Sequence, residues 1–244
     1  MGQPIEAASD LSSTVSVLVD DAAGLSIDFT LDGIQFTAAD QKSGANLKSV
    51  SQAVDGKLIH VFVWKSPSVK IARYDNGPNQ FVVPRSLQTG GDLLKFVDLM
   101  VHEAVHAAFD LQKQHVLKVL DESFAYVTQF LYRRLKSGKG NPPPNDKVLM
   151  AADKVADYII GQSQGSGTVV VPDTILNPLK EAIKKDGMYK DWATEITYDG
   201  AEAKPPAGEV GHPKRKPDSK ALKHGPVSGS HASRFRTPGT YGIG

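Results

Sequence analysis

The sequence predicts an α+β fold, with a small N-terminal mixed sheet packed on one long helix, a helical C-terminal half and then a disordered tail. Residues 14–90 contain short β-branched and aromatic runs separated by turn-forming residues. From Asp92 onward, apolar residues recur at helical spacing. Beyond residue 200, Pro and Gly are frequent and large apolar side chains are sparse. Such a composition cannot form a core, so residues 1–200 are predicted to be the folded domain and residues 201–244 the tail.

Five short segments are predicted to form the strands. Each is rich in β-branched or aromatic residues, and turn formers such as Asp32-Gly33, Asp55-Gly56 and Asn76-Gly77-Pro78 separate them. The predicted strands are Thr14–Val19, Leu25–Phe29, Ile34–Thr37, Leu58–Val63 and Gln80–Val83.

Four helices are predicted in the second half. The first begins at Asp92, an N-cap candidate after two glycines, and keeps its apolar i, i+3, i+4 spacing to Leu111. The second runs from about His115 to Lys136 and ends at Gly138. The third and fourth are Asp146–Ile160 and Pro172–Lys185, the latter stopped by Asp186-Gly187.

Composition excludes several classes of function. The chain has 28 Lys and Arg against 27 Asp and Glu. Eight of the basic residues but only three of the acidic ones lie in the tail, so the body is mildly acidic. Nucleic acid is therefore not its expected partner. Without any cysteine there is no disulfide, no thiolate metal site and no cysteine nucleophile. No run approaches the roughly 18 apolar residues of a membrane span, and no Sec signal pattern is present. We expect no membrane association and, by default, a cytoplasmic protein, with non-Sec export as the open alternative.

A His-Glu-x-x-His motif lies inside the strongest predicted helix, at His102, Glu103 and His106. Two histidines four residues apart share one helix face, with Cβ atoms about 6 Å apart, so both imidazoles can reach one metal ion. Glu103 lies beside them, where its carboxylate can take a proton from a water molecule on that metal. The competing interpretation is a helix with two buried histidines and a salt-bridged glutamate. The apolar surroundings argue against it, because ionisable side chains there need a partner.

A catalytic zinc site needs a third protein ligand, and Glu122 is the best candidate by geometry. Asp110 continues the histidine stripe but lies about 12 Å from His102 along the helix axis, too far to complete the set. If the chain reverses near Lys113-Gln114, His106 and Glu122 lie about equally far from the turn and become level on an antiparallel helix pair.

The weak point of this prediction is the turn itself, since residues 112–115 contain neither Gly nor Pro. A helix continuous from Asp92 to Lys136 would place Glu122 roughly 24 Å from His106, but such a length is far outside the usual range. His115, His60 and Asp121 are lesser ligand candidates. Asp121 is also a candidate to orient a ligating imidazole, with a solvated helix residue as the alternative.

The two segments His102-Glu103-Ala104-Val105-His106 and Asp121-Glu122-Ser123-Phe124-Ala125 resemble the gluzincin arrangement of zinc metallopeptidases. The resemblance implies a zincin-like domain in which His102, His106 and Glu122 bind Zn²⁺ and Glu103 is the catalytic base that passes its proton to the leaving amine. The metzincin pattern does not fit, because Phe109 and Gln112 stand where it needs Gly and His, and peptide deformylases need a cysteine ligand.

The predicted function is therefore a zinc-dependent peptidase that hydrolyses peptide or protein substrates. Tyr126, one turn beyond Glu122, is the candidate catalytic electrophile for the oxyanion. Tyr158, Tyr189 and Tyr198 are alternatives, with aromatic core packing as the competing interpretation for each. Gln80–Val83 is predicted to be a sheet edge close to the metal, to which an extended peptide adds by main-chain hydrogen bonds.

Two other functions remain open from the sequence. One is a non-enzymatic module of the same fold with a structural metal, which a closed four-ligand site would indicate. The other is an adaptor that binds an acidic partner or nucleic acid through the basic cluster at residues 212–217 of the tail.

Overall fold

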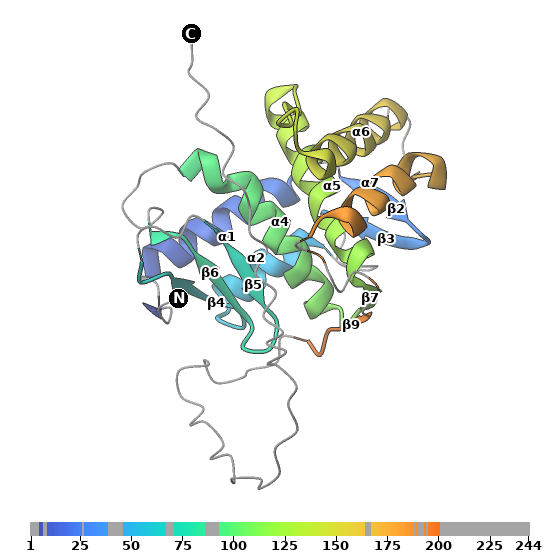
Figure 1. The fold of residues 1–244 in the computed structure, drawn as a ribbon. Helices are drawn as coiled ribbons and strands as arrows, with labels where there is room; N and C mark the ends of the chain where they lie inside the picture. The colour runs from blue at the N-terminus through green and yellow to red at the C-terminus, as the bar shows by residue number, and fades with distance from the viewer. Residues whose placement is uncertain are drawn as a thin grey trace, which may run out of the picture.

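The predicted α+β class is confirmed by a computed structural model of the chain. It describes residues 5–6, 9–25, 27–38, 46–66, 71–85, 93–163, 167–187, 189, 193 and 195–200. The expected N-cap at Asp92 and the expected disordered tail lie outside these residues. Figure 1 shows the strands β4, β6 and β5 on one side of the long helix α4 (Leu93–Leu111), and the helices of the C-terminal half on the other.

The main sheet has four strands in the order β1-β4-β6-β5. β4 and β6 are parallel, whereas the outer strands β1 and β5 each pair antiparallel with their neighbour. Their bounds are Ile5–Glu6 for β1, His60–Val63 for β4, Gln80–Val83 for β6 and Arg73–Asp75 for β5.

Gln80–Val83 is not the sheet edge that was predicted from the sequence. The segment is a strand with the predicted bounds, but it lies between β4 and β5 and all four of its residues are buried. Both of its hydrogen-bonding edges are occupied, so no peptide can add to it. The sheet instead ends at β5, a short strand that the sequence analysis did not predict because Arg73–Asp75 has no run of β-branched residues.

A second correction concerns Thr14–Val19, which is not a strand but the middle of helix α1 (Ser9–Ala23). Leu11, Val15 and Val19 are buried at a spacing of four, whereas Val17 is 65% exposed. An alternating strand would have buried Val15, Val17 and Val19 together on one face. The helical period of burial therefore outweighs the β propensity of the valines.

α1 packs against the second unpredicted helix, α2 (Leu47–Asp55), and both contact α4. α2 is capped by Asn46, whose side chain accepts a hydrogen bond from Ser49 N at 2.7 Å. α1 also contacts β4 of the sheet, and both helices add to the apolar surroundings of α4.

A second sheet joins β3 (Ile34–Thr37), β2 (Asp28–Leu31) and β8 (Val169–Val170) in that order. Asp32 and Gly33 connect β2 and β3 with φ of 46° and 78°, the two positive values of a type I′ turn, which suits a two-residue hairpin. The strand predicted over Leu25–Phe29 thus begins three residues later than expected. The hairpin carries Phe29 and Phe36 into the core, where each ring contacts Phe124.

The reversal between the two motif-bearing helices occurs where it was predicted. α4 ends in a Schellman motif: Gln114 N donates to Phe109 O at 3.0 Å, Lys113 N donates to Asp110 O at 2.9 Å, and Lys113 has φ of 52°. Lysine occupies the left-handed position that glycine usually takes, which is why the sequence shows no turn signal there. The chain then forms β7 (His115–Leu117), so α5 (Lys118–Ser137) begins later than the predicted His115.

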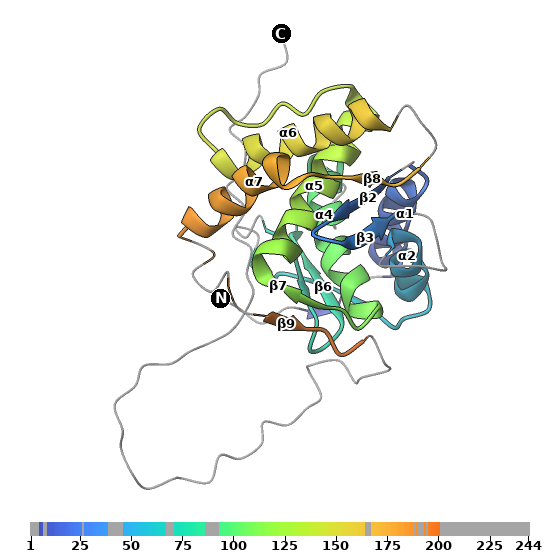
Figure 2. The same cartoon turned by 90° about the vertical axis from the view of Figure 1, so that its right-hand side faces the viewer.

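The C-terminal half contains the third and fourth predicted helices, α6 (Lys147–Gln162) and α7 (Asp173–Lys185). α5 packs against α4, α6 and α7, and α6 packs against α7. Figure 2 shows α6 and α7 along one side of α5, with β7 and its partner β9 (Glu195–Thr197) near its N-terminal end. None of the helices in the described part of the chain combines the length and hydrophobicity of a membrane-spanning segment.

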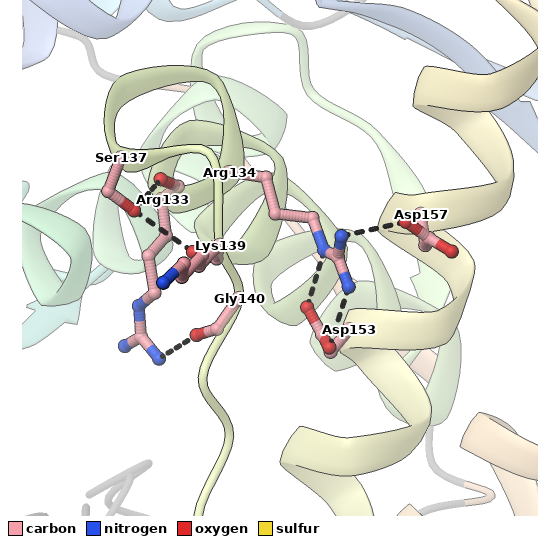
Figure 3. A network of polar contacts seen from close by, with 7 residues as sticks. All are labelled: Arg133, Arg134, Ser137, Lys139, Gly140, Asp153 and Asp157. Atoms are coloured by element: carbon pink, nitrogen blue, oxygen red, sulfur yellow. Dashed lines mark hydrogen bonds and ion pairs between the residues drawn. The ribbon is translucent and has the colours of Figure 1, made fainter.

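A network of ion pairs joins α5 to α6 (Figure 3). Arg134 Nε and Nη2 donate to the two oxygens of Asp153 at 2.6 and 2.9 Å, and Nη1 reaches Asp157 at 2.7 Å. Beside them Arg133 Nη1 donates to Gly140 O at 3.1 Å. A Cβ on Gly140 would lie 1.5 Å from Asp153 Oδ1, so only glycine allows the loop to pass this close to the ion pair.

Candidate metal centre

The His-Glu-x-x-His segment lies in the middle of α4, where every residue from 101 to 110 is buried. His102 and Glu103 have exposed fractions of 0% and 1%, and His106 of 8%. The two imidazole rings are neighbours on one face of the helix and meet edge to face, with centroids 5.1 Å apart. Polar side chains buried this deeply need a hydrogen-bonding partner, a counter-charge or a metal ion.

Glu122 on α5 lies opposite the two histidines, as the predicted turn requires. One potential ligand atom from each of His102, His106 and Glu122 lies within 4.8 Å of the others. His102 Nε2 is 3.6 Å from Glu122 Oε2. The structure thus brings together the three predicted ligands, from two helices that face each other, in a cluster that could hold a metal ion. His60 in β4 and His115 in β7 are not part of this cluster.

Asp121 lies behind His106 rather than in the cluster. Its Oδ2 is 2.8 Å from His106 Nδ1. With Nδ1 facing a carboxylate, His106 presents its other ring nitrogen, Nε2, to the cluster. This is the orienting position that the sequence analysis offered for Asp121.

The charges around the cluster shift the pKa values of its members. Burial alone would lower the pKa of His106, but Asp121, Glu122 and Glu103 together raise it to about 10. Burial alone would raise the pKa of Glu122, but His102 and His106 lower it below its usual value. The carboxylates that raise the pKa of His106 also favour a bound cation, which would take the place of the imidazole proton.

Glu103 links the motif to the edge of the main sheet. Its Oε2 accepts a hydrogen bond from the backbone N–H of Tyr74 in β5 at 2.7 Å. Burial raises the pKa of Glu103, against the opposing effects of the two histidines and of this hydrogen bond. Tyr74 is thus a residue that links the edge strand to the motif, and nothing in its local sequence indicated this.

The side chain of Tyr74 makes a second connection to the same helix. Its hydroxyl donates to Asp110 Oδ2 at 2.6 Å, and Asp110 Oδ1 accepts from Gly200 N at 3.0 Å. Burial and the Asp110 carboxylate raise the pKa of Tyr74, so its hydroxyl stays protonated. Asp110 is not part of the ligand cluster, and it anchors two other segments of the chain.

Tyr126 lies one turn beyond Glu122, and its ring packs edge-on against His102 with centroids 4.6 Å apart. Its hydroxyl is 2.6 Å from the hydroxyl of Tyr189. Burial and the Glu122 carboxylate raise the pKa of both tyrosines. Two of the four tyrosines considered from sequence thus meet beside the cluster, whereas Tyr158 packs on the hydrophobic core from α6.

The fourth tyrosine, Tyr198, follows β9 and contacts Asp121. Its hydroxyl donates to both Asp121 oxygens at 3.2 Å. From sequence, Tyr198 was a candidate only for the oxyanion. Its position next to Asp121 depends on the pairing of β9 with β7, which no sequence signal predicted.

Comparison of the chain with protein-family models, with curated proteins and with solved structures found no match. Inferences about function therefore depend on the geometry and chemistry of this cluster.

Proposed function

We propose that the chain is a zinc-dependent peptidase with a gluzincin-type ligand set. The observation that carries the proposal is the buried His102, His106 and Glu122 cluster, with Glu103 next to the first histidine on the same helix. Two imidazoles and one carboxylate are the donor set of zinc hydrolases in which a fourth position stays open for water or substrate.

The residues present fit a divalent metal. Among the described residues, Glu122 Oε2 is buried and accepts no hydrogen bond, which leaves it available as a ligand. The contact of Asp121 with His106 Nδ1 selects Nε2 of that ring for the metal. Imidazole nitrogen and carboxylate oxygen suit zinc better than calcium or magnesium, which prefer oxygen alone.

When bound, the metal would polarise the scissile carbonyl and lower the pKa of the attacking water. Glu103 would serve as the general base that takes up the proton of the water and passes it to the leaving amine. The hydrogen bond that Tyr74 N donates to Oε2 fixes the position of this carboxylate. The paired hydroxyls of Tyr126 and Tyr189 are the candidates to donate a hydrogen bond to the oxyanion.

A second candidate is a non-enzymatic domain in which the metal is structural. The observation that favours it is the burial of the cluster, whose members are at most 8% exposed. A site that no substrate enters can still stabilise the fold, because a metal that binds only the native state adds its binding free energy to stability.

The first experiment measures metal content in purified wild-type protein, Glu122→Ala and Glu103→Gln. We expect about one zinc per wild-type chain, loss of zinc in Glu122→Ala, and retention of zinc in Glu103→Gln. Elemental analysis gives the stoichiometry, and circular dichroism confirms that each variant is folded. A folded Glu122→Ala protein with unchanged zinc would contradict the ligand assignment.

The second experiment separates an enzyme from a structural domain. Wild-type protein is incubated with a broad peptide library, and cleavage is followed by mass spectrometry. We expect cleavage by the wild type and a rate about 10²–10⁴-fold lower for Glu103→Gln, the usual contribution of a general base. A zinc-loaded wild type that cleaves nothing in the library would favour the structural alternative.

A further inference from the structure

Tyr198 is held beside the metal cluster by the short β7–β9 sheet. Thr197, the last residue of β9, pairs with His115 of β7, and Tyr198 N then donates to Gln114 O at 3.2 Å. The backbone of Tyr198 is thus fixed to the segment that connects α4 and α5. Its side chain is buried and extends to the first turn of α5.

The hydroxyl of Tyr198 bridges the two oxygens of Asp121 at equal distances of 3.2 Å. A carboxylate bound through both oxygens cannot turn about its Cβ–Cγ bond without breaking a contact. The same carboxylate approaches His106 Nδ1 through Oδ2 at 2.8 Å. Tyr198, Asp121 and His106 therefore form a continuous chain of polar contacts from the C-terminal segment to a candidate ligand.

We propose that Tyr198 is a positioning residue for the metal: by fixing the Asp121 carboxylate, it orients the His106 imidazole for coordination. The inference rests on the proposed metal site and adds a residue 92 positions beyond His106 to it. Groups that orient a ligating histidine typically change metal affinity by 10–100-fold when they are removed. Tyr198 acts one contact farther out, so its loss is expected to weaken zinc binding about 10-fold.

The test is Tyr198→Phe, which removes the hydroxyl and keeps the buried ring. The matched control is Tyr132→Phe, because Tyr132 OH also donates to a carboxylate, that of Asp21 at 2.9 Å, on the opposite end of α5 from the cluster. Zinc affinity is measured by competition with a chromophoric chelator, and the visible spectrum of the Co²⁺-substituted proteins reports ligand geometry. We expect a roughly 10-fold loss of affinity and an altered Co²⁺ spectrum for Tyr198→Phe, with neither change in Tyr132→Phe.

A double-mutant cycle with Asp121→Asn separates positioning from general destabilisation. If Tyr198 acts through Asp121, removing its hydroxyl from the Asp121→Asn protein should cost little further affinity. Additive losses would overturn the proposal. Asp121→Asn with wild-type affinity would overturn it as well, even if Tyr198→Phe failed to fold.

The failure of this inference is distinguishable from failure of the metal site itself. A wild-type protein that binds neither Zn²⁺ nor Co²⁺ would refute the proposed function. Wild-type binding with Tyr198→Phe equal to Tyr132→Phe in affinity and spectrum would refute only the positioning role.

Discussion

Replacing Tyr74 with phenylalanine tests whether the edge strand is anchored to the motif helix through Asp110. The substitution removes one hydroxyl from a buried ring and leaves the backbone hydrogen bond from Tyr74 N to Glu103 available. The lost bond is a short one, 2.6 Å, to a carboxylate that is completely buried. Water cannot replace the hydroxyl there without a rearrangement of the core.

A hydrogen bond to a buried charged group contributes about 1.5–3 kcal/mol, so we expect Tyr74→Phe to lower the free energy of unfolding by about 2–3 kcal/mol. Asp110 retains its bond from Gly200 N, which argues for this range rather than a larger loss. For a folded unit of this size, the change corresponds to a melting temperature lower by roughly 4–12 °C.

Urea denaturation monitored by circular dichroism measures the effect, with Tyr132→Phe as the control. Tyr132 donates to Asp21, whose side chain is 42% exposed, so water can take over and the control should lose less than about 1 kcal/mol. If Tyr74→Phe were no less stable than Tyr132→Phe, the anchoring role of the Tyr74–Asp110 contact would be refuted.

Three further predictions concern titration, packing and the tail. The pKa of His106 is about 10 in the metal-free protein, above its value in the unfolded chain. The free energy of unfolding of chelator-treated protein should therefore be highest below pH 6.5 and fall as the pH rises toward 10. A free energy of unfolding in urea that stays constant over this range would contradict the prediction. Gly140→Ala should lower the free energy of unfolding by about 1–3 kcal/mol, because the added Cβ would displace Asp153. The control in the same denaturation assay is Gly161→Ala, at an exposed helical position with no atom within 4 Å of the added Cβ, which should be neutral or stabilising. Deletion of residues 201–244 should leave the melting temperature and zinc content nearly unchanged, since their composition cannot form a core; a large drop in calorimetry would show that they dock on the body.

The parts of the fold that sequence predicted well are those in which burial and propensity agree. α6 begins directly after Asp146, the predicted first residue of this helix, and the Asp146 side chain caps it by accepting from Leu149 N. α7 ends at the predicted Asp186. The three clustered residues were also predictable, because a four-residue spacing on one helix and a symmetric distance from a turn are local properties of the chain.

The errors arose where tertiary contacts decide the outcome. Valines in α1 indicated a strand, yet the helix is stabilised by burying one face against α2 and α4. The order of strands in a sheet is not encoded by any one strand, so Gln80–Val83 was predicted correctly as a strand and wrongly as an edge. Tyr74 and Tyr198 reach Glu103 and Asp121 because β5 pairs with β6 and β9 pairs with β7, and such long-range pairings leave no periodic pattern in one sequence.

The three clustered residues and the groups that hold them are made at different times during synthesis. His102, His106 and Glu122 lie in one helical hairpin of about twenty residues, whereas Tyr198 follows Glu122 by 76 residues. At a translation rate of about 5–20 residues per second, the hairpin leaves the ribosome roughly 4–15 s before its C-terminal partners. An ion captured by the hairpin alone would be held without the contacts that fix Asp121 and Asp110. Docking of the segment around Tyr198 and Gly200 would then slow release of the ion, because this segment supplies the contacts to Asp121 and Asp110.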